Sequence, residues 1–262
     1  MDQIALQELL SALPLGAVRY VDETASTNDD ALQWLAEGAP DASLVCAGMQ
    51  TRGRGRMERA WYSTPGASLA FSVIFHAGSA EPQAVSLLAP FAGLAVCKAL
   101  ETSLGLSPCI KWPNDVLLGG KKVAGVLAEA VWDGPVCRGV VIGIGVNVAS
   151  RSIPPMQALV FPAGSIEQAA GRTVDRWELL HAIIAELLHS RSTIGSTGFF
   201  QEWEGRLAFK GERVEVFPPA GGRVSGRLAG ITPAGSLRIG LDDGTTRDVE
   251  AGDVSLRPAP GL

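Results

Sequence analysis

One short segment, in which arginines alternate with glycines, has the residue types needed to bind an anion. Residues 52–59 contain four arginines, and Gly53 and Gly55 separate the first three of them. Planar guanidinium groups suit carboxylates and phosphates, and a backbone with glycines can approach a ligand closely. The segment is therefore a candidate anion-binding loop. On composition alone, a solvated basic loop or a weak RNA-binding Arg-Gly run explains it equally well.

Lysines and a carboxylate come together in a second segment. The run Lys111-Trp112-Pro113-Asn114-Asp115 is followed closely by Gly119-Gly120-Lys121-Lys122-Val123-Ala124-Gly125. The lysines stand on both sides of an expected hairpin that also holds a carboxylate. An anionic substrate with a metal counter-ion would need this mixture of charges. Ordinary turn chemistry also explains Pro-Asn-Asp. A phosphate-binding Walker A loop is excluded, because Lys122 stands where that motif requires Ser or Thr.

Two shorter motifs carry polar side chains. Ser26-Thr27-Asn28 stands at an expected helix start, where capping explains one of the three side chains and leaves two for a small polar ligand. Gly143-Ile144-Gly145-Val146-Asn147 is not a dinucleotide fingerprint, since Val148 occupies the third glycine position and no helix follows. Glycines within a strand suggest close approach by a ligand or another strand. Asn147 is either a satisfied core amide or a ligand contact.

The elements that must position these motifs alternate between helices and strands. We expect a helix from 26 to 37 and a second from 83 to 104, bent near Pro90. Buried strands are expected at 43–49 and 68–75, and a series of strands joined by tight turns follows from 109 to 148.

The character of the sequence changes near Leu207. From there on, short β-type runs are punctuated by glycine-containing turns, which suggests a small β-barrel. The sequence therefore predicts an α+β fold with two domains, 1–207 and 208–262.

The overall composition narrows the class of protein. Of 262 residues, 47% are hydrophobic and 19% charged, which favours a sizeable core over disorder. The net charge of −5 argues against a surface that coats nucleic acid or anionic membrane. The sequence shows neither a membrane-spanning run nor a secretion signal, and its four cysteines are scattered. Reduced thiols and a cytoplasmic location are expected.

The order and spacing of these motifs together resemble biotin–protein ligases, over nearly the whole chain up to Ser255-Leu256-Arg257. The resemblance implies a class II synthetase-like mixed sheet flanked by helices, with a small C-terminal SH3-like β-barrel. It also implies an AMP-forming ligase that activates biotin with ATP to biotinyl-5′-AMP. The biotinyl group is then transferred to a specific lysine of a biotin carboxyl carrier protein or domain.

The resemblance also implies roles for individual residues. Lys122, Lys111 and Arg56 would be catalytic, with Lys122 between the biotin carboxylate and the α-phosphate. Asp115 would hold Mg²⁺. The residues that would bind biotin are Ser26, Thr27, Asn28, Gln50, Arg54, Gly55, Arg56, Lys122 and Gly125. Those that would bind the nucleotide are Arg56, Arg59, Lys111, Asn114 and Asn147.

Two features of this sequence differ from many members of the family that it resembles. Glu58 stands where a glycine is usual in the arginine loop, which leaves the path of that loop open. The Ser-Thr-Asn motif begins at residue 26, which leaves no room for the DNA-binding domain that some relatives carry. We therefore expect the short, ligase-only form, with no specific DNA binding, no membrane association and a possible homodimer. The alternatives are a lipoate–protein ligase, against which the arginine loop and the Lys-Trp-Pro-Asn-Asp motif argue, and a non-catalytic Arg-Gly nucleic-acid-binding module.

Overall fold

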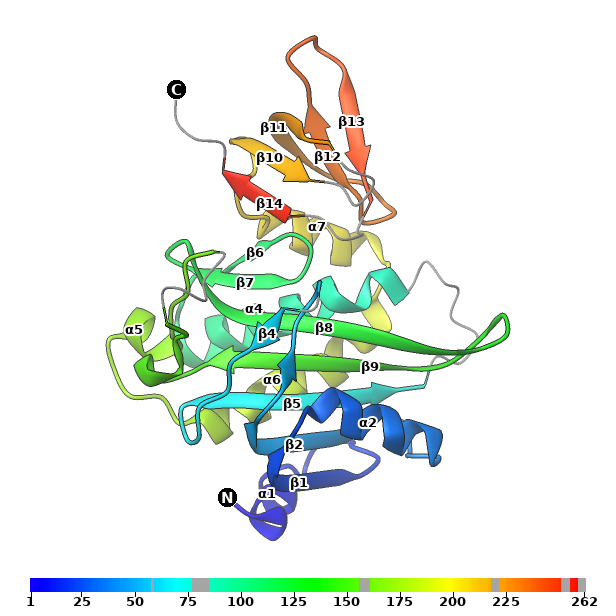
Figure 1. The fold of residues 1–262 in the computed structure, drawn as a ribbon, viewed down its shortest axis with the longest axis vertical. Coiled ribbons are helices and arrows are strands. Elements are labelled where there is room, and N and C mark those ends of the chain that lie inside the picture. The colour runs from blue at the N-terminus through cyan, green and yellow to red at the C-terminus, as the bar shows by residue number, and fades with distance from the viewer. Residues whose placement is uncertain (58, 77–84, 156–160, 218–221, 251–254, 259–262) are drawn as a thin grey trace.

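A seven-stranded mixed sheet forms the centre of the larger part of the molecule (Figure 1). The computed structural model describes residues 1–262 except 58, 77–84, 156–160, 218–221, 251–254 and 259–262. The strands, in their order across the sheet, are β1 (Val18–Thr24), β2 (Ser43–Gln50), β5 (Ser68–Phe75), β9 (Val136–Asn147), β8 (Lys121–Asp133), β7 (Asp115–Leu118) and β6 (Cys109–Lys111). β1 pairs with β2 in parallel, and the other neighbours are antiparallel. The short β3 (Gly53–Arg54) and β4 (Ala60–Trp61) pair with each other.

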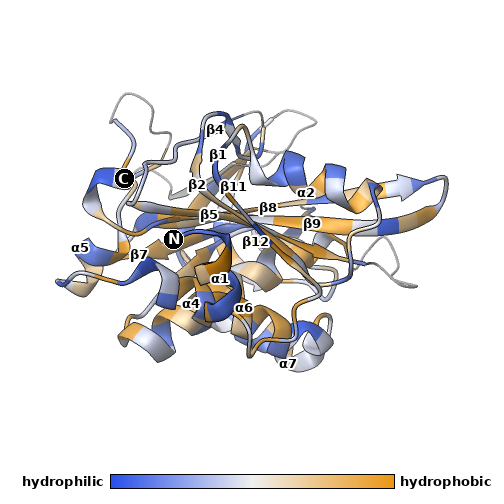
Figure 2. Ribbon diagram, turned by 90° about the horizontal axis from the view of Figure 1, so that it is seen from below, coloured by the Kyte–Doolittle hydropathy of each residue, from blue (hydrophilic) through white to orange (hydrophobic). Residues whose placement is uncertain are grey.

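Helices cover the two faces of this sheet unequally. The helices are α1 (Gln3–Leu9), α2 (Thr27–Ala36), α4 (Leu88–Leu104), α5 (Ile166–Ala170), α6 (Arg176–Ser190) and α7 (Thr197–Gly205), with short 3-10 turns at Ser150–Ser152 and Arg191–Thr193. Figure 2 shows α1, α4, α6 and α7 on one side of the sheet and α2 on the other. The face that carries α2 is thus only partly covered by helices, and this leaves room for a site.

Side chains along β5 alternate between the two faces of the sheet and contribute to a hydrophobic core on each face. Leu69, Phe71 and Val73 belong to the large core under α4 and α6, whereas Ile74 packs in the smaller core beneath α2. Because side chains of a strand alternate between faces, Ser72 also points toward α2. The strand is buried along its whole length, as its continuous apolar run predicts.

The second expected helix is interrupted close to its proline. Residues 85 and 86 are helical, Leu87 forms a turn, and α4 runs from Leu88 to Leu104. Pro90 has no amide hydrogen to donate to the carbonyl of residue 86, four positions earlier, so the helical hydrogen bonding breaks close to where the sequence predicted a bend. Residues 83 and 84 of the expected helix lie outside the described residues. Within the described part of the chain, no helix is long and apolar enough to cross a bilayer.

A five-stranded antiparallel sheet follows near the C-terminus (Figure 1). Its strands, in order across the sheet, are β13 (Thr246–Val249), β12 (Leu237–Gly240), β11 (Val224–Ile231), β10 (Arg213–Phe217) and β14 (Ser255–Pro258). The short β-type runs predicted for this part of the chain are confirmed.

One turn of this small sheet packs against the larger part of the molecule. The indole nitrogen of the fully buried Trp112 donates a hydrogen bond to the carbonyl oxygen of Gly235 at 3.0 Å. A β-carbon added at Gly235 would lie 2.9 Å from Leu87 Cδ2 and 3.3 Å from Trp203 Cζ3. The turn is thus held closely enough that a side chain at position 235 would force Leu87 to move.

Alanine at position 235 is expected to be more destabilising than alanine at a comparable glycine, Gly244. Gly235 and Gly244 have φ of +80° and +83°, so both substitutions carry the left-handed backbone cost of about 1–2 kcal/mol. A β-carbon at Gly244 meets nothing within 4 Å, whereas at Gly235 overpacking adds about 1–3 kcal/mol. Urea unfolding of both variants checks this. Equal losses of unfolding free energy would show that the turn is not tightly packed.

Candidate functional site

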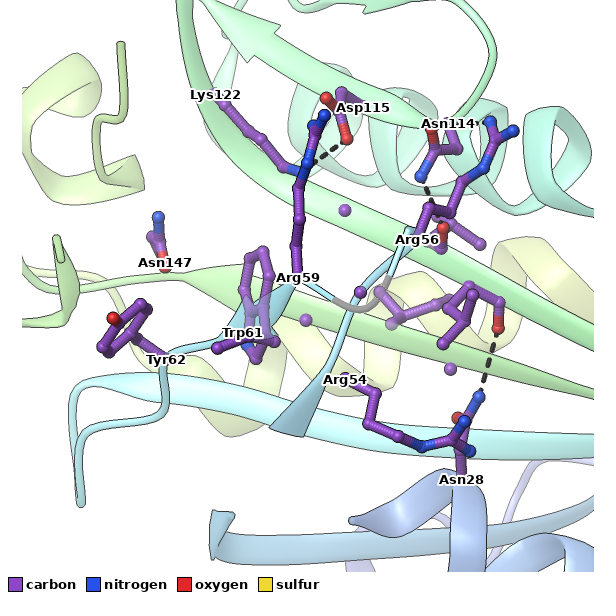
Figure 3. Close-up of a pocket in the computed structure, with 18 of the residues that line it drawn as sticks. Asn28, Arg54, Arg56, Arg59, Trp61, Tyr62, Asn114, Asp115, Lys122 and Asn147 are labelled. Carbon is purple, nitrogen blue, oxygen red and sulfur yellow. Dashed lines mark hydrogen bonds and ion pairs between the residues drawn. The ribbon is translucent and has the colours of Figure 1, made fainter. Parts of the chain in front are cut away.

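A cavity of about 320 Å³ lies on the α2 face of the main sheet (Figure 3). Every residue that the sequence predicted for the site lines it: Ser26, Thr27, Asn28, Gln50, Arg54, Gly55, Arg56, Arg59, Lys111, Asn114, Asp115, Lys122, Gly125 and Asn147. These residues come from five separate segments of the chain, so the fold brings together what the motifs only suggested. What each residue binds stays a prediction.

The Gly-x-Gly-x-Asn run of β9 forms part of the cavity floor. Ile144 and Val146 point into the large core, so Gly143, Gly145 and Asn147 face the cavity. A β-carbon at Gly143 would lie 2.0 Å from Asn28 Oδ1. The predicted close approach is therefore made by side chains of this chain. Asn147 is buried and donates to the carbonyl of Gly164 at 3.2 Å while it lines the cavity.

Hydroxyl and amide groups gather where α2 begins. Gln50 Oε1 accepts hydrogen bonds from the backbone nitrogen of Thr27 at 2.7 Å and from its hydroxyl at 3.0 Å. Ser72 Oγ lies 2.6 Å from Asn28 Oδ1 and 2.8 Å from Thr27 Oγ1. Ser26 occupies the N-cap position, but its side chain makes no capping hydrogen bond. Capping therefore explains none of the three side chains, contrary to the expectation from sequence. This end of the cavity is rich in neutral polar groups.

Two lysines share one carboxylate at the other end of the cavity. Asp115 Oδ1 lies 2.6 Å from Lys122 Nζ, and Oδ2 lies 3.6 Å from Lys111 Nζ. Burial acts to raise the pKa of Asp115, but the two ammonium groups hold it below its ordinary value. Burial lowers the pKa of Lys111, and the negative charge of Asp115 acts to raise it. The positive charges of Lys122 and Arg59 lower it further, so the pKa lies below its ordinary value. Asp115 is therefore ionised at neutral pH.

A β-bulge turns Lys122 toward the cavity. Val116 pairs with Ala124 but Leu117 pairs with Lys122, so Val123 is an extra residue in β8. Lys122 is fixed further by its backbone, whose nitrogen donates to the carbonyl of Pro162 at 2.8 Å. The bulge allows Val123 and Ala124 to be buried together while Lys122 and Gly125 line the cavity.

The surroundings of Asp115 do not fit a magnesium ion held by the protein. Mg²⁺ prefers several oxygen ligands, and two ammonium groups so close to one carboxylate would repel a cation. Among the described residues, no group of three or more His, Cys, Asp or Glu side chains could hold a metal. The positive charge at this end of the cavity comes from Lys111 and Lys122, with Arg59 close by (Figure 3).

The arginine segment folds over the cavity as a small hairpin. The backbone nitrogen of Gly55 donates to the carbonyl of Arg59 at 2.7 Å, and Arg56 Nη1 lies 3.4 Å from its acceptor, Asn114 Oδ1. Figure 3 shows Arg59 with Lys122 and Asp115 at one end, and Arg54 near Asn28 at the other. Glu58, whose effect on the loop was left open, lies outside the described residues.

The sequence motifs did not identify two residues at this site. The ring of Trp61 lies so close to β9 that a β-carbon at Gly145 would come within 2.2 Å of it. Its indole nitrogen is buried and has no hydrogen-bond partner among the described residues. The second residue is Glu129, which pairs with Arg54. A single carboxylate in an otherwise apolar stretch of β8 was the available signal for it.

Comparisons with known proteins agree with this arrangement. Residues 20–147 match the Biotin/lipoate A/B protein ligase family, and residues 211–257 match the biotin protein ligase C-terminal domain. The biotin–[acetyl-CoA-carboxylase] ligase of Mycobacterium tuberculosis is 34% identical over 97% of this chain and 95% of its own length. The bifunctional ligase/repressor BirA of Bacillus spizizenii is 32% identical over 90% of this chain and 73% of its own length.

A solved structure shows the same fold. Biotin protein ligase from Aquifex aeolicus, in complex with biotin and ATP, aligns with a TM-score of 0.79 and 28% identity. The alignment covers 93% of this chain and 99% of that one. With motifs, fold and relatives in agreement, the chain belongs to the biotin protein ligase family.

Proposed function

We propose that this protein is a biotin–protein ligase that acts in two steps. The biotin carboxylate attacks the α-phosphorus of ATP, which forms biotinyl-5′-AMP and releases pyrophosphate. The amine of a carrier-domain lysine then attacks the biotinyl carbonyl, and AMP leaves. The observation that carries this proposal is one cavity with neutral hydrogen-bonding groups at one end and clustered ammonium groups at the other.

Both nucleophiles belong to substrates, so the protein's work is positioning and charge stabilisation. A carboxylate and a phosphate repel each other when they approach. Lys122 is held by Asp115 at the end of the cavity where these groups would meet. Its ammonium group offsets the two negative charges without having to reorient.

The other predicted residues divide between the two ligands. We assign Ser26, Thr27, Asn28 and Gln50 to biotin, because its fused-ring head is neutral and polar. We assign Lys111 and Arg59 to the phosphates of ATP, and Asn114 and Asn147 to the rest of the nucleotide. We assign Gly125 to the biotin site through its neighbours, because a β-carbon there would lie 3.0 Å from Lys122 Nζ and 3.3 Å from Trp61 Cζ3.

We also propose that the domains divide at 207/208 and that the C-terminal sheet is an SH3-like barrel. Support comes from its five short antiparallel strands and from the match of residues 211–257 to a separate C-terminal domain. We propose that the protein partner is a carrier domain that presents one lysine for biotinylation.

Pyrophosphate exchange into ATP separates this function from its nearest alternative. Purified protein is incubated with labelled pyrophosphate, ATP-Mg²⁺ and either biotin or lipoate. Exchange that depends on biotin, and persists when lipoate competes, is expected. Exchange driven by lipoate alone would indicate a lipoate ligase instead.

Alanine at Gly145 is expected to weaken nucleotide binding. Its β-carbon would overlap the Trp61 ring and push it into the cavity. We assign the Trp61 ring, which lines the cavity, to the adenine base, so the KM for ATP should rise about tenfold, since base–aromatic stacking contributes about 1–3 kcal/mol. Gly205→Ala is the control, because a β-carbon there meets nothing within 4 Å. An unchanged KM for ATP in Gly145→Ala would remove Trp61 from this role.

A further inference from the structure

We propose that Glu129 is a positioning residue that fixes both the arginine loop and Asn28 at the biotin end of the cavity. The inference deepens the proposed function and depends on it for the identity of the ligand. Glu129 does not itself line the cavity, whereas its partners Arg54 and Asn28 do. It acts from behind the cavity wall, through residues that are placed to touch the ligand.

Arg54 is bound by Glu129 through two parallel hydrogen bonds. Arg54 Nη1 donates to Glu129 Oε1 at 2.9 Å, and Nη2 donates to Oε2 at 2.8 Å. Asp29, in the first turn of α2, adds an ion pair of 2.7 Å to Nη2. Burial alone would lower the pKa of Arg54, but these carboxylates hold it above its ordinary value. A paired fork of this kind fixes direction as well as distance.

The same carboxylate sets the orientation of Asn28. Asn28 Nδ2 donates to Glu129 Oε2 at 2.6 Å, so its Oδ1 is directed toward Ser72 Oγ. The missing side chain of Gly143 leaves the space that this amide occupies. Glu129 therefore joins three segments that are distant in sequence: the start of α2, the arginine loop and the middle of β8.

These contacts change the role expected for Arg54. Sequence resemblance implied that Arg54 contacts biotin, but its guanidinium already faces two carboxylates. At the opposite end, Lys111 and Lys122 share the single carboxylate of Asp115, and the charge of Arg59 acts on Lys111 as well. Two lysines against one carboxylate leave positive charge in excess at that end, so the ligand's anionic groups belong there and its neutral ring near Asn28. Arg54 is thus the anchor of the loop rather than a carboxylate receptor.

Glu129→Gln tests the anchor with almost no change in shape. The variant keeps one acceptor oxygen but places an amide donor against a guanidinium that can only donate. Loss of a charge-assisted pair typically weakens an interaction about tenfold or more. We expect the Kd for biotin to rise about tenfold, with kcat for pyrophosphate exchange at saturating biotin changed by less than about threefold. Trypsin should also cleave the arginine loop of the ligand-free variant faster.

Asp133→Asn is the matched control. Asp133 lies on the same strand and pairs with Arg138, but both side chains are more than 60% exposed and neither lines the cavity. Its biotin affinity and its tryptic cleavage should equal those of the wild type. Asp29→Asn, which removes the single, more exposed contact to Arg54, should give a smaller change than Glu129→Gln in the same direction.

The outcomes separate the inference from the proposed function. If the wild-type protein fails to bind biotin, the proposed function is wrong. If the wild type binds biotin and Glu129→Gln matches it in affinity and in loop cleavage, the positioning role is wrong. Should Glu129→Gln fail to fold, Glu129→Asp, which keeps the charge but withdraws the carboxylate from Arg54 and Asn28, decides the question by the same two measurements.

Discussion

Replacing Lys122 by alanine is expected to slow biotin-dependent pyrophosphate exchange by about 10²–10³-fold. The ammonium group is held 2.6 Å from Asp115 and backed by a β-bulge, so it is already in place when the two anionic substrates meet. Loss of one preorganised charge-stabilising group costs a rate factor of this size in other active sites. Exchange measured at saturating biotin and ATP gives the effect on chemistry rather than on binding.

Two further variants distinguish a catalytic loss from a folding defect. Lys121→Ala removes the neighbouring lysine, which is exposed and does not line the cavity, and it should retain wild-type exchange. Lys122→Ala leaves Asp115 paired with Lys111, one ammonium group against one carboxylate, so the variant should still fold. Lys122→Gln keeps an uncharged hydrogen-bond donor beside Asp115, and it should fold but remain slow. Near wild-type exchange in a folded Lys122→Ala protein would remove Lys122 from its role.

Replacing Arg56 by glycine is expected to release the adenylate faster while affecting its formation less. Arg56 is half-buried, lines the cavity and reaches the Asn114 side chain across from its own hairpin. Its removal deletes charge-assisted contacts and makes the loop more flexible, so the ordered loop is populated less. The dissociation rate of preformed biotinyl-5′-AMP should rise about tenfold or more. Bystander proteins should then be biotinylated by adenylate that has leaked into solution.

Arg52→Gly provides the comparison for Arg56→Gly. Arg52 belongs to the same segment but is exposed and does not line the cavity, so its replacement adds similar flexibility without removing a cavity contact. Adenylate dissociation and bystander labelling should stay at wild-type levels. If Arg56→Gly also stays there, the loop does not retain the intermediate.

The strand pattern and the motifs allowed much of this arrangement to be predicted. The apolar run of β5 and the Gly-Gly turn before β8 are local signals, and both features are found where expected. The motifs converge on one cavity because they stand at the ends or on one face of neighbouring strands. The break before α4 was predicted from Pro90, although the exact position of the turn at Leu87 was not.

Pairings between distant segments could not be predicted from the sequence. The partner of Arg54 lies 75 positions away on β8, and nothing near Glu129 indicates which segment crosses it. Likewise, Trp112 contacts the C-terminal sheet through Gly235, 123 positions away. Ser26-Thr27-Asn28 has the composition of a helix cap, yet the side chains of Thr27 and Asn28 hydrogen-bond residues on strands of the main sheet. Such contacts depend on the register of the assembled sheet.

Intact mass measurement of a carrier domain tests the central claim most directly. The protein is incubated with biotin, ATP-Mg²⁺ and a purified biotin carboxyl carrier domain, with a second sample in which the acceptor lysine is replaced by arginine. We predict that one biotinyl group is added to the lysine-bearing domain, in an ATP-dependent manner, and none to the arginine variant. A carrier mass that does not change with ATP and biotin present, while the protein is folded, would contradict the assignment of this chain as a biotin–protein ligase.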